Sequence, residues 1–123
     1  MRILGAALAI AALPLVHSPA PAAAAASACV RPPTRNVDHG SGVMKGSFNL
    51  KAGPYAGGSC AVVTRLSAGQ VLYFQCWVKN RRGNMWVYAR VKGTGTMGWM
   101  SVDNLRDIRD TGYDRCPREN TRV

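Results

Sequence analysis

The sequence is poor in side chains that exchange protons near neutral pH. Its 123 residues include six acidic side chains and two histidines, and His17 lies in an apolar N-terminal stretch. Nucleophilic catalysis needs a base within hydrogen-bond reach, and sugar hydrolysis needs two facing carboxylates. Only Asp38 and Asp103 precede the C-terminal segment that holds the remaining acidic residues. Neither arrangement can be assembled from this inventory, so we expect the protein not to be an enzyme.

Zinc-ligand spacing and sustained helical periodicity are absent as well. The four cysteines include no C-x-x-C pair, and His39 is a lone histidine in a glycine-rich stretch, which is typical of solvated surface. We therefore expect no metal site and no cofactor, and we expect the cysteines to form disulfides in an oxidising compartment. The lack of a helical period and of an internal repeat disfavours a helical bundle and a repeat array. A chain of 123 residues has room for one domain.

The N-terminus has the pattern of an export signal. One basic residue follows the first methionine, residues 3–16 are apolar, and a run of small residues comes next. This order is typical of a secretory signal peptide and too short for a stable membrane span. We assign residues 1–28 to the signal peptide and cleavage region, with cleavage after residue 26 or 28. Lipidation of Cys29 is the alternative, but Ala26 stands where a larger aliphatic residue is usual, and an odd number of cysteines would be left.

The charge of the chain is strongly positive. Sixteen Lys and Arg residues and six acidic residues give a formal net charge of +10 at pH 7, and loss of Arg2 with the signal would leave +9 (10 − 1). Such a field attracts polyanions. Because an exported chain is separated from nucleic acid, we expect no nucleic-acid partner. The basic residues are scattered along the sequence, so solubility alone explains the charge equally well.

Short apolar runs separated by glycine occupy residues 47–105 and are typical of a small all-β domain. Residues 29–46 contain Arg31-Pro32-Pro33 and several glycines, so we predict an extended N-terminal connector pinned by its cysteine. Residues 106–123 are charged and poor in apolar side chains, and we expect a tail stapled to the domain by Cys116. The predicted organisation is therefore an all-β domain with disulfide-pinned terminal extensions.

A first hairpin is predicted around Ser67-Ala68-Gly69, a three-residue loop in which Gly69 would take the left-handed conformation. Centring the hairpin on this loop pairs Leu66 with Gln70, Thr64 with Leu72, Val62 with Phe74, and Cys60 with Cys76. A disulfide would then join Cys60 to Cys76. The second disulfide would join Cys29 to Cys116 and tie the two extensions together. A further bulge would shift this register.

A second hairpin is predicted around the turn Asn80-Arg81-Arg82-Gly83, which would bring Trp77 close to Trp86. Its return strand over residues 85–91 alternates two sets of side chains, of which the smaller and wholly apolar set should face the core. The inner set is Val87, Ala89 and Val91, and the outer set is Trp86, Tyr88 and Arg90. After the last strand, we predict a single helical turn over residues 102–105.

Four motifs taken together resemble the bacterial SH3-like domain family. The matching stretches are Asn49-Leu50-Lys51-Ala52-Gly53-Pro54, Val62 to Leu66 with Ser67-Ala68-Gly69, Trp86-Val87-Tyr88-Ala89-Arg90, and Gly98-Trp99-Met100 with Asn104-Leu105. Cys60 and Cys76 are similar to the cysteines of a secreted subgroup found in filamentous Gram-positive bacteria. Lys51, Ala52 and Met100 depart from the residues usual in the family, which puts an inherited ligand preference in doubt. The resemblance implies a small SH3-like barrel of about five to seven short strands.

The same resemblance implies a non-catalytic module that binds cell-wall peptidoglycan or an associated anionic polymer, outside the cell or on its wall. SH3-type barrels commonly present aromatic side chains in a shallow groove, to which a basic residue adds charge. The candidates are Tyr55, Trp86, Tyr88, Arg90 and Trp99. Alternatively, Trp77 and Trp86 only cap the core.

A second class of function is a small secreted inhibitor or effector that acts on another protein. Here the loop Asn80-Arg81-Arg82-Gly83-Asn84 would offer a basic side chain to the partner, for example to the pocket of a secreted protease.

Overall fold

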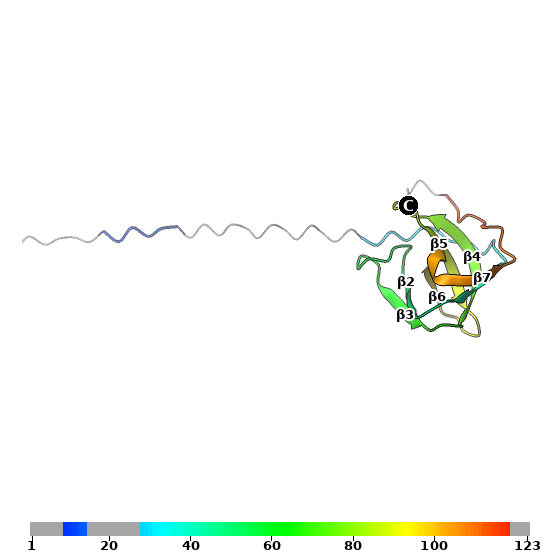
Figure 1. The fold of residues 1–123 in the computed structure, drawn as a ribbon. Coiled ribbons are helices and arrows are strands. Elements are labelled where there is room, and N and C mark those ends of the chain that lie inside the picture. The colour runs from blue at the N-terminus through cyan, green and yellow to red at the C-terminus, as the bar shows by residue number, and fades with distance from the viewer. Residues whose placement is uncertain (1–8, 15–27, 119–123) are drawn as a thin grey trace, which may run out of the picture.

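The computed structural model describes residues 9–14 and 28–118 (Figure 1). Most of the predicted signal peptide, including the cleavage position after residue 26, lies outside the described residues. Residues 9–14 carry no helix or strand, and the side chains of Ile10 and Leu13 are exposed. Within the two described ranges, no helix has the length and apolar character needed to cross a membrane.

Seven antiparallel strands form a single sheet, so the prediction of an all-β fold is confirmed. The strands are β1 (Ser41–Met44), β2 (Phe48–Lys51), β3 (Val62–Leu66), β4 (Val71–Lys79), β5 (Met85–Val91), β6 (Met97–Ser101) and β7 (Leu105–Arg109). Their order in the sheet is β3-β2-β6-β5-β4-β1-β7. A 3₁₀ turn, η1 (Val102–Asn104), joins β6 to β7 and agrees with the predicted helical turn.

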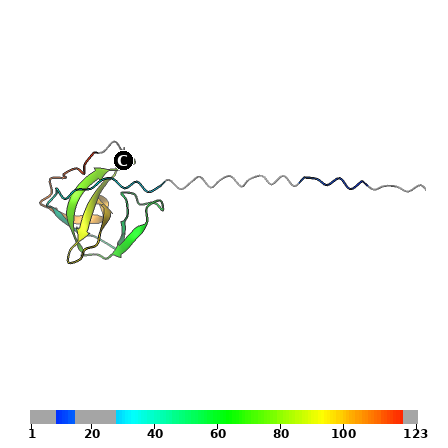
Figure 2. The same cartoon turned by 180° about the vertical axis from the view of Figure 1, so that it is seen from behind.

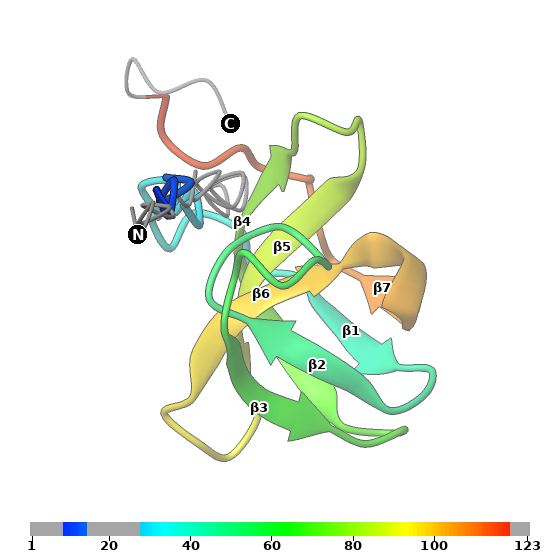
Figure 3. The ribbon, with the colours of Figure 1, turned by 90° about the vertical axis from the view of Figure 1, so that its left-hand side faces the viewer.

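The sheet of the described residues is not closed into a barrel, because β3 and β7 form its two edges. The seven strands thus form an open curled sheet where a small barrel was expected. The sheet is strongly curled (Figure 3), since Leu66 of β3 packs in the same core as Met44 of β1 and Phe74 of β4. Curling lets a single sheet enclose its own apolar face, which a domain must bury to be stable.

The core contains eleven buried side chains drawn from all seven strands. They are Met44, Leu50, Leu66, Leu72, Phe74, Trp77, Val87, Ala89, Val91, Met100 and Leu105. Strand β5 has the predicted bounds, and its inner set lies in this core as predicted. The predicted contact of Trp77 with Trp86 is wrong, because the two rings lie on opposite faces. Trp77 stands opposite Val87 in the core, whereas Trp86 stands opposite Val78 on the outer face.

The first predicted hairpin is wrong, although its turn is present. Gly69 has the expected positive φ of 87°, and the Gln70 amide donates to the Ser67 carbonyl at 3.2 Å. Strand β3 pairs with β2, however, and β4 pairs with β1 and β5. The turn is held by β1 instead, since the Gly69 amide donates to the Met44 carbonyl at 2.8 Å. Strand β1, which comes from the predicted connector, therefore pairs with β4 in the position where β3 was predicted.

The disulfides join Cys29 to Cys60 and Cys76 to Cys116, with Cα–Cα distances of 4.7 and 4.8 Å. All four cysteines are bonded, as expected, but the predicted pairing is wrong. The pairing of Cys60 with Cys76 depended on β3 lying beside β4. Because β2, β6 and β5 separate those strands in the sheet, Cys60 meets the N-terminal connector and Cys76 meets the tail.

Both predicted extensions contribute to the sheet. The connector supplies β1, and the tail supplies most of β7. The connector and the tail also cover the free edge of β4 beyond its pairing with β1. The Val37 and Asp38 amides donate to the Gln75 carbonyl, the Trp77 amide donates to the Asp114 carbonyl, and the Cys116 amide donates to the Trp77 carbonyl. The tail is therefore stapled to the domain as predicted, through Cys76 rather than Cys29.

Candidate functional site

Three of the predicted site residues gather on the outer face of the sheet. Tyr88 of β5 stands opposite Trp99 of β6, and their ring centroids lie 5.2 Å apart. Trp99 is 2% exposed and Trp86 is 4% exposed, whereas Tyr88 is half-buried. They pack with Val37, Val78 and the sulfur-bearing residues Cys76 and Cys116. The predicted groove is thus a second, smaller core.

The N-terminal segment of residues 29–38, here called the strap, covers this face. One end is tied to Cys60 beside β2, and at the other end Val37 donates to the Gln75 carbonyl of β4. Because β6 and β5 lie between β2 and β4, the strap crosses both strands, as Figure 2 shows from behind. Pro32 in its middle is buried. The sequence pattern placed Trp86 and Tyr88 on the outer face correctly, but it did not predict that the strap covers them.

The two indole N–H groups of β4 and β5 have different surroundings. Trp77 Nε1 donates to Asp38 Oδ2 at 3.2 Å and to Thr111 Oγ1 at 3.1 Å. Trp86 Nε1 is the one buried side-chain nitrogen or oxygen in the described part of the chain that has no hydrogen-bond partner. The face beneath the strap is therefore held by apolar packing and a disulfide, without a side-chain hydrogen bond from Trp86.

Asp38 is a buried structural acceptor that sequence reasoning listed only as a carboxylate. It is 1% exposed. Its Oδ1 accepts from the Gly40 amide at 2.7 Å, and its Oδ2 accepts from Thr111 Oγ1 at 2.7 Å, the Asp114 amide at 3.1 Å and Trp77 Nε1. These bonds join strap, core and tail. An Asp two residues before Gly favours the local turn, but its distant partners left no signal in the sequence.

The other two predicted site residues lie apart from the aromatic cluster. The Arg90 guanidinium lies 5.2 Å from the centroid of the Tyr73 ring, and its Nη1 donates to the Thr94 carbonyl at 3.2 Å. Tyr55 is half-buried in the β2–β3 loop, where its Oη accepts from the Arg81 amide at 3.2 Å. Arg90 is therefore engaged at one end of β5, and Tyr55 supports the turn at the other.

The β4–β5 turn is rigidly supported by Asn80, which is 5% exposed. Its Nδ2 donates to the Pro54 carbonyl at 2.7 Å, and its Oδ1 accepts from the Arg82 amide at 3.0 Å and the Asn84 amide at 3.1 Å. Side-chain bonds of Asn to backbone amides stabilise tight turns. The backbone that carries Arg82 is consequently fixed against the β2–β3 loop.

Four segments meet around this turn, and we call them together the basic end. They are residues 29–36, 52–61, 78–84 and 115–118. The first two are joined by the Cys29–Cys60 disulfide, the second and third by the bond from Asn80 to Pro54, and the fourth is anchored beside β4 through Cys116. They contain seven basic residues and no acidic residue. The seven, all exposed, are Arg31, Arg35, Lys79, Arg81, Arg82, Arg115 and Arg118.

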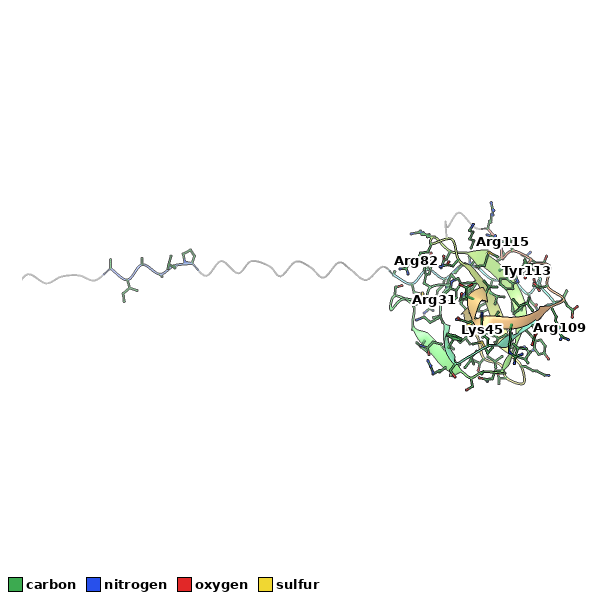
Figure 4. The ribbon with its side chains drawn as sticks, viewed as in Figure 1. Arg31, Lys45, Arg82, Arg109, Tyr113 and Arg115 are labelled. Carbon is green, nitrogen blue, oxygen red and sulfur yellow. A yellow bond between two sulfur atoms is a disulfide. The ribbon has the colours of Figure 1, made fainter. Side chains whose placement is uncertain are left out.

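The exposed acidic side chains of the described residues lie outside these four segments, although Asp114 directly precedes Arg115. They are Asp103, Asp107, Asp110 and Asp114, in η1, in β7 and in the segment that follows it. Arg106 forms an ion pair with Asp107 there. In Figure 4, Arg31, Arg82 and Arg115 lie toward the side of the β4–β5 turn, whereas Lys45 and Arg109 lie away from it. Among the described residues, cations therefore outnumber acidic side chains around the β4–β5 turn, and most of the acidic side chains lie along η1 and β7.

The described side chains include no group of three or more His, Cys, Asp or Glu residues placed to hold a metal ion. Comparisons of the chain with protein-family models, curated proteins and solved structures gave no match.

Proposed function

We propose that this chain is a secreted, non-catalytic binding module with an SH3-like fold, directed to cell-wall peptidoglycan or an associated anionic polymer. The observation that carries the proposal is the basic end, where seven exposed cations on four segments outnumber the one described acidic side chain at its border, Asp114. Concentrated charge of one sign attracts polyanions. The motif resemblance supports an SH3-like fold and the cell wall as the ligand. Two disulfides are typical of extracellular proteins.

Burial of Trp86 and Trp99 changes the expected mode of binding. Rings that are covered by the strap offer no stacking surface, so attraction in this proposal comes from charge. Binding should then weaken as salt rises, because exposed charges are screened over about 10 Å at 0.1 M ionic strength.

Sedimentation of the disulfide-intact protein with washed cell walls tests the proposal. We expect most of the protein in the pellet at low salt and release into the supernatant near 1 M salt, where the screening length falls to about 3 Å. Protein that stays in the supernatant at every salt concentration would refute wall binding.

The supported β4–β5 turn favours one alternative, an inhibitor or effector of another protein. Its Arg82 is exposed on a backbone held by Asn80, and a preorganised loop loses little entropy on binding. Capture of a secreted protease by the immobilised protein, abolished by Arg82→Ala, would favour this alternative over the wall.

A further inference from the structure

We infer that the basic end is a binding site for a linear polymer that carries a phosphodiester in every repeat. This inference rests on the proposed function and names the ligand chemistry within it. Three features of the basic end support it: the kind of cation, the number of cations, and the disulfides that hold the segments together.

The cations of the basic end are mostly arginines. Six of the seven are Arg, and Lys79 is the exception, whereas the other basic residues of the described part comprise four Arg and three Lys. A guanidinium presents a rigid fork of donors that binds two oxygens of a phosphate at once, which an ammonium group cannot do. The composition of this end therefore favours oxyanion recognition over simple charge.

The number of cations favours a ligand with closely repeated charge. An isolated carboxylate of a wall peptide would engage one or two of the seven side chains and leave the others facing one another. A polymer with one phosphodiester per repeat places successive charges along the surface and engages several cations together, with release of its counterions.

The basic end lacks the second feature of a site for single-stranded nucleic acid. Such sites combine positive charge with aromatic rings on which bases stack. The four segments contain one aromatic residue, Tyr55, which is half-buried and whose hydroxyl accepts from the Arg81 amide. The end therefore suits a polyol or sugar phosphate better than a chain of bases.

Both disulfides contribute to the arrangement. Cys29–Cys60 places Arg31 beside the β2–β3 loop, and Cys76–Cys116 places Arg115 beside β4. Because the Cys116 amide donates to the Trp77 carbonyl and Arg115 pairs with Trp77 in parallel, the tail leads toward Lys79. Preorganisation of this kind reduces the ordering cost of binding.

Two triple variants with the same change in charge test the site. The first is Lys79→Gln, Arg82→Gln and Arg115→Gln in the basic end. The control is Lys45→Gln, Lys92→Gln and Arg109→Gln, three exposed cations outside the four segments. Circular dichroism and denaturant midpoints should match the parent protein for both, which shows that the fold is retained.

Affinity for soluble polyphosphate is the first measurement. We expect the basic-end variant to lose about tenfold or more in affinity, and the slope of log K against log salt to fall by about 2, since each phosphate contact contributes roughly 0.7 to 0.9. The control variant should lose less than about threefold. Equal losses in the two variants would overturn the inference in favour of net charge alone.

The chemistry of the ligand is tested with competing polymers. If the basic end is specific for phosphate, polyphosphate should bind at least about tenfold more tightly than polygalacturonate of equal charge. Equal binding of the carboxylate polymer would overturn the phosphate assignment. Tighter binding of single-stranded DNA than of polyphosphate would overturn the assignment to a polymer without bases.

Binding to intact and to extracted cell walls distinguishes a failure of this inference from a failure of the proposed function. Walls from which phosphate polymers have been extracted should bind less protein than intact walls, and the basic-end variant should bind intact walls poorly. If extracted walls and the variant both bind normally, the inference fails and wall binding stands. If intact walls do not bind the parent protein, the proposed function fails.

Discussion

Replacing Asp38 with Ala should destabilise the domain strongly, because this buried carboxyl group accepts four hydrogen bonds from three parts of the chain. Gly40 lies at the start of the sheet, Trp77 lies in the core, and Thr111 and Asp114 belong to the segment after β7. Loss of the acceptor leaves the donors either unpaired or dependent on water.

The magnitude follows from how each donor is placed. The Gly40 amide belongs to a buried residue and would lose its acceptor, which costs about 1–3 kcal/mol. Trp77 Nε1 keeps Thr111 Oγ1 as an acceptor, so its loss is about 1 kcal/mol. Thr111 and Asp114 are more accessible and can be rehydrated. The sum is a decrease of about 3 kcal/mol in the free energy of unfolding.

Guanidinium chloride unfolding of the disulfide-intact protein measures this loss as a shift in midpoint at constant m-value. Asp38→Asn preserves the shape and one acceptor oxygen, so it should cost about half as much as Asp38→Ala. The exposed Asp103→Ala is the control, with an expected change within about 0.5 kcal/mol. A loss below about 1 kcal/mol for Asp38→Ala would refute the reasoning.

Four further predictions concern the disulfides and the core packing. Non-reducing peptide mapping should give Cys29–Cys60 and Cys76–Cys116 peptides, and a Cys60–Cys76 peptide would contradict the fold. Sequence separations of 31 and 40 predict that paired Ser replacements of either disulfide cost about 4 kcal/mol in denaturant unfolding. Gly53→Ala would place Cβ 2.6 Å from both sulfurs of the first disulfide, so it should lower the free energy of unfolding by about 1–3 kcal/mol. Gly57→Ala, with nothing within 4 Å, is the control, and equal midpoints would argue against this packing. Trp77→Phe should cost about 1–2 kcal/mol more than Trp86→Phe, because only Trp77 loses hydrogen bonds from its indole N–H; the reverse order would place the wrong ring in the core.

Local patterns predicted the features that depend on near neighbours. The alternation along β5 gave its bounds and its two faces, because successive side chains of a strand point in opposite directions. The left-handed Gly69 and the turn of η1 also followed from short stretches of sequence. Each depends on residues a few positions apart, so the sequence contains the relevant information.

The prediction of the first hairpin was wrong for a physical reason. A favourable loop at Ser67-Ala68-Gly69 does not decide which strand lies beside β4, because β1 competes for that edge. The glycines and prolines of residues 29–46 concealed the short strand Ser41–Met44. Once β1 is placed beside β4, the predicted pairing of Cys60 with Cys76 is impossible.

The prediction that Trp86 and Trp99 are accessible to a ligand was wrong for a different reason. Alternation placed Trp86 and Tyr88 on the correct face, but it does not say what covers a face. The strap of residues 29–38 crosses it and excludes solvent from two of the rings. The basic end could not be predicted from the sequence either. Its arginines come from three segments that lie far apart along the chain, namely residues 29–36, 78–84 and 115–118.

The sequence by itself determined the all-β class, the inner and outer faces of β5, the bonding of all four cysteines and the positive net charge, since composition and alternation need no knowledge of distant contacts. Only the tertiary structure decided which cysteines meet, what buries the aromatic face, and where charge gathers. Those outcomes depend on strand order in the curled sheet, which brings residues 29–36, 78–84 and 115–118 to one end. Contacts across such separations are fixed by competition among all the strands rather than by any single motif.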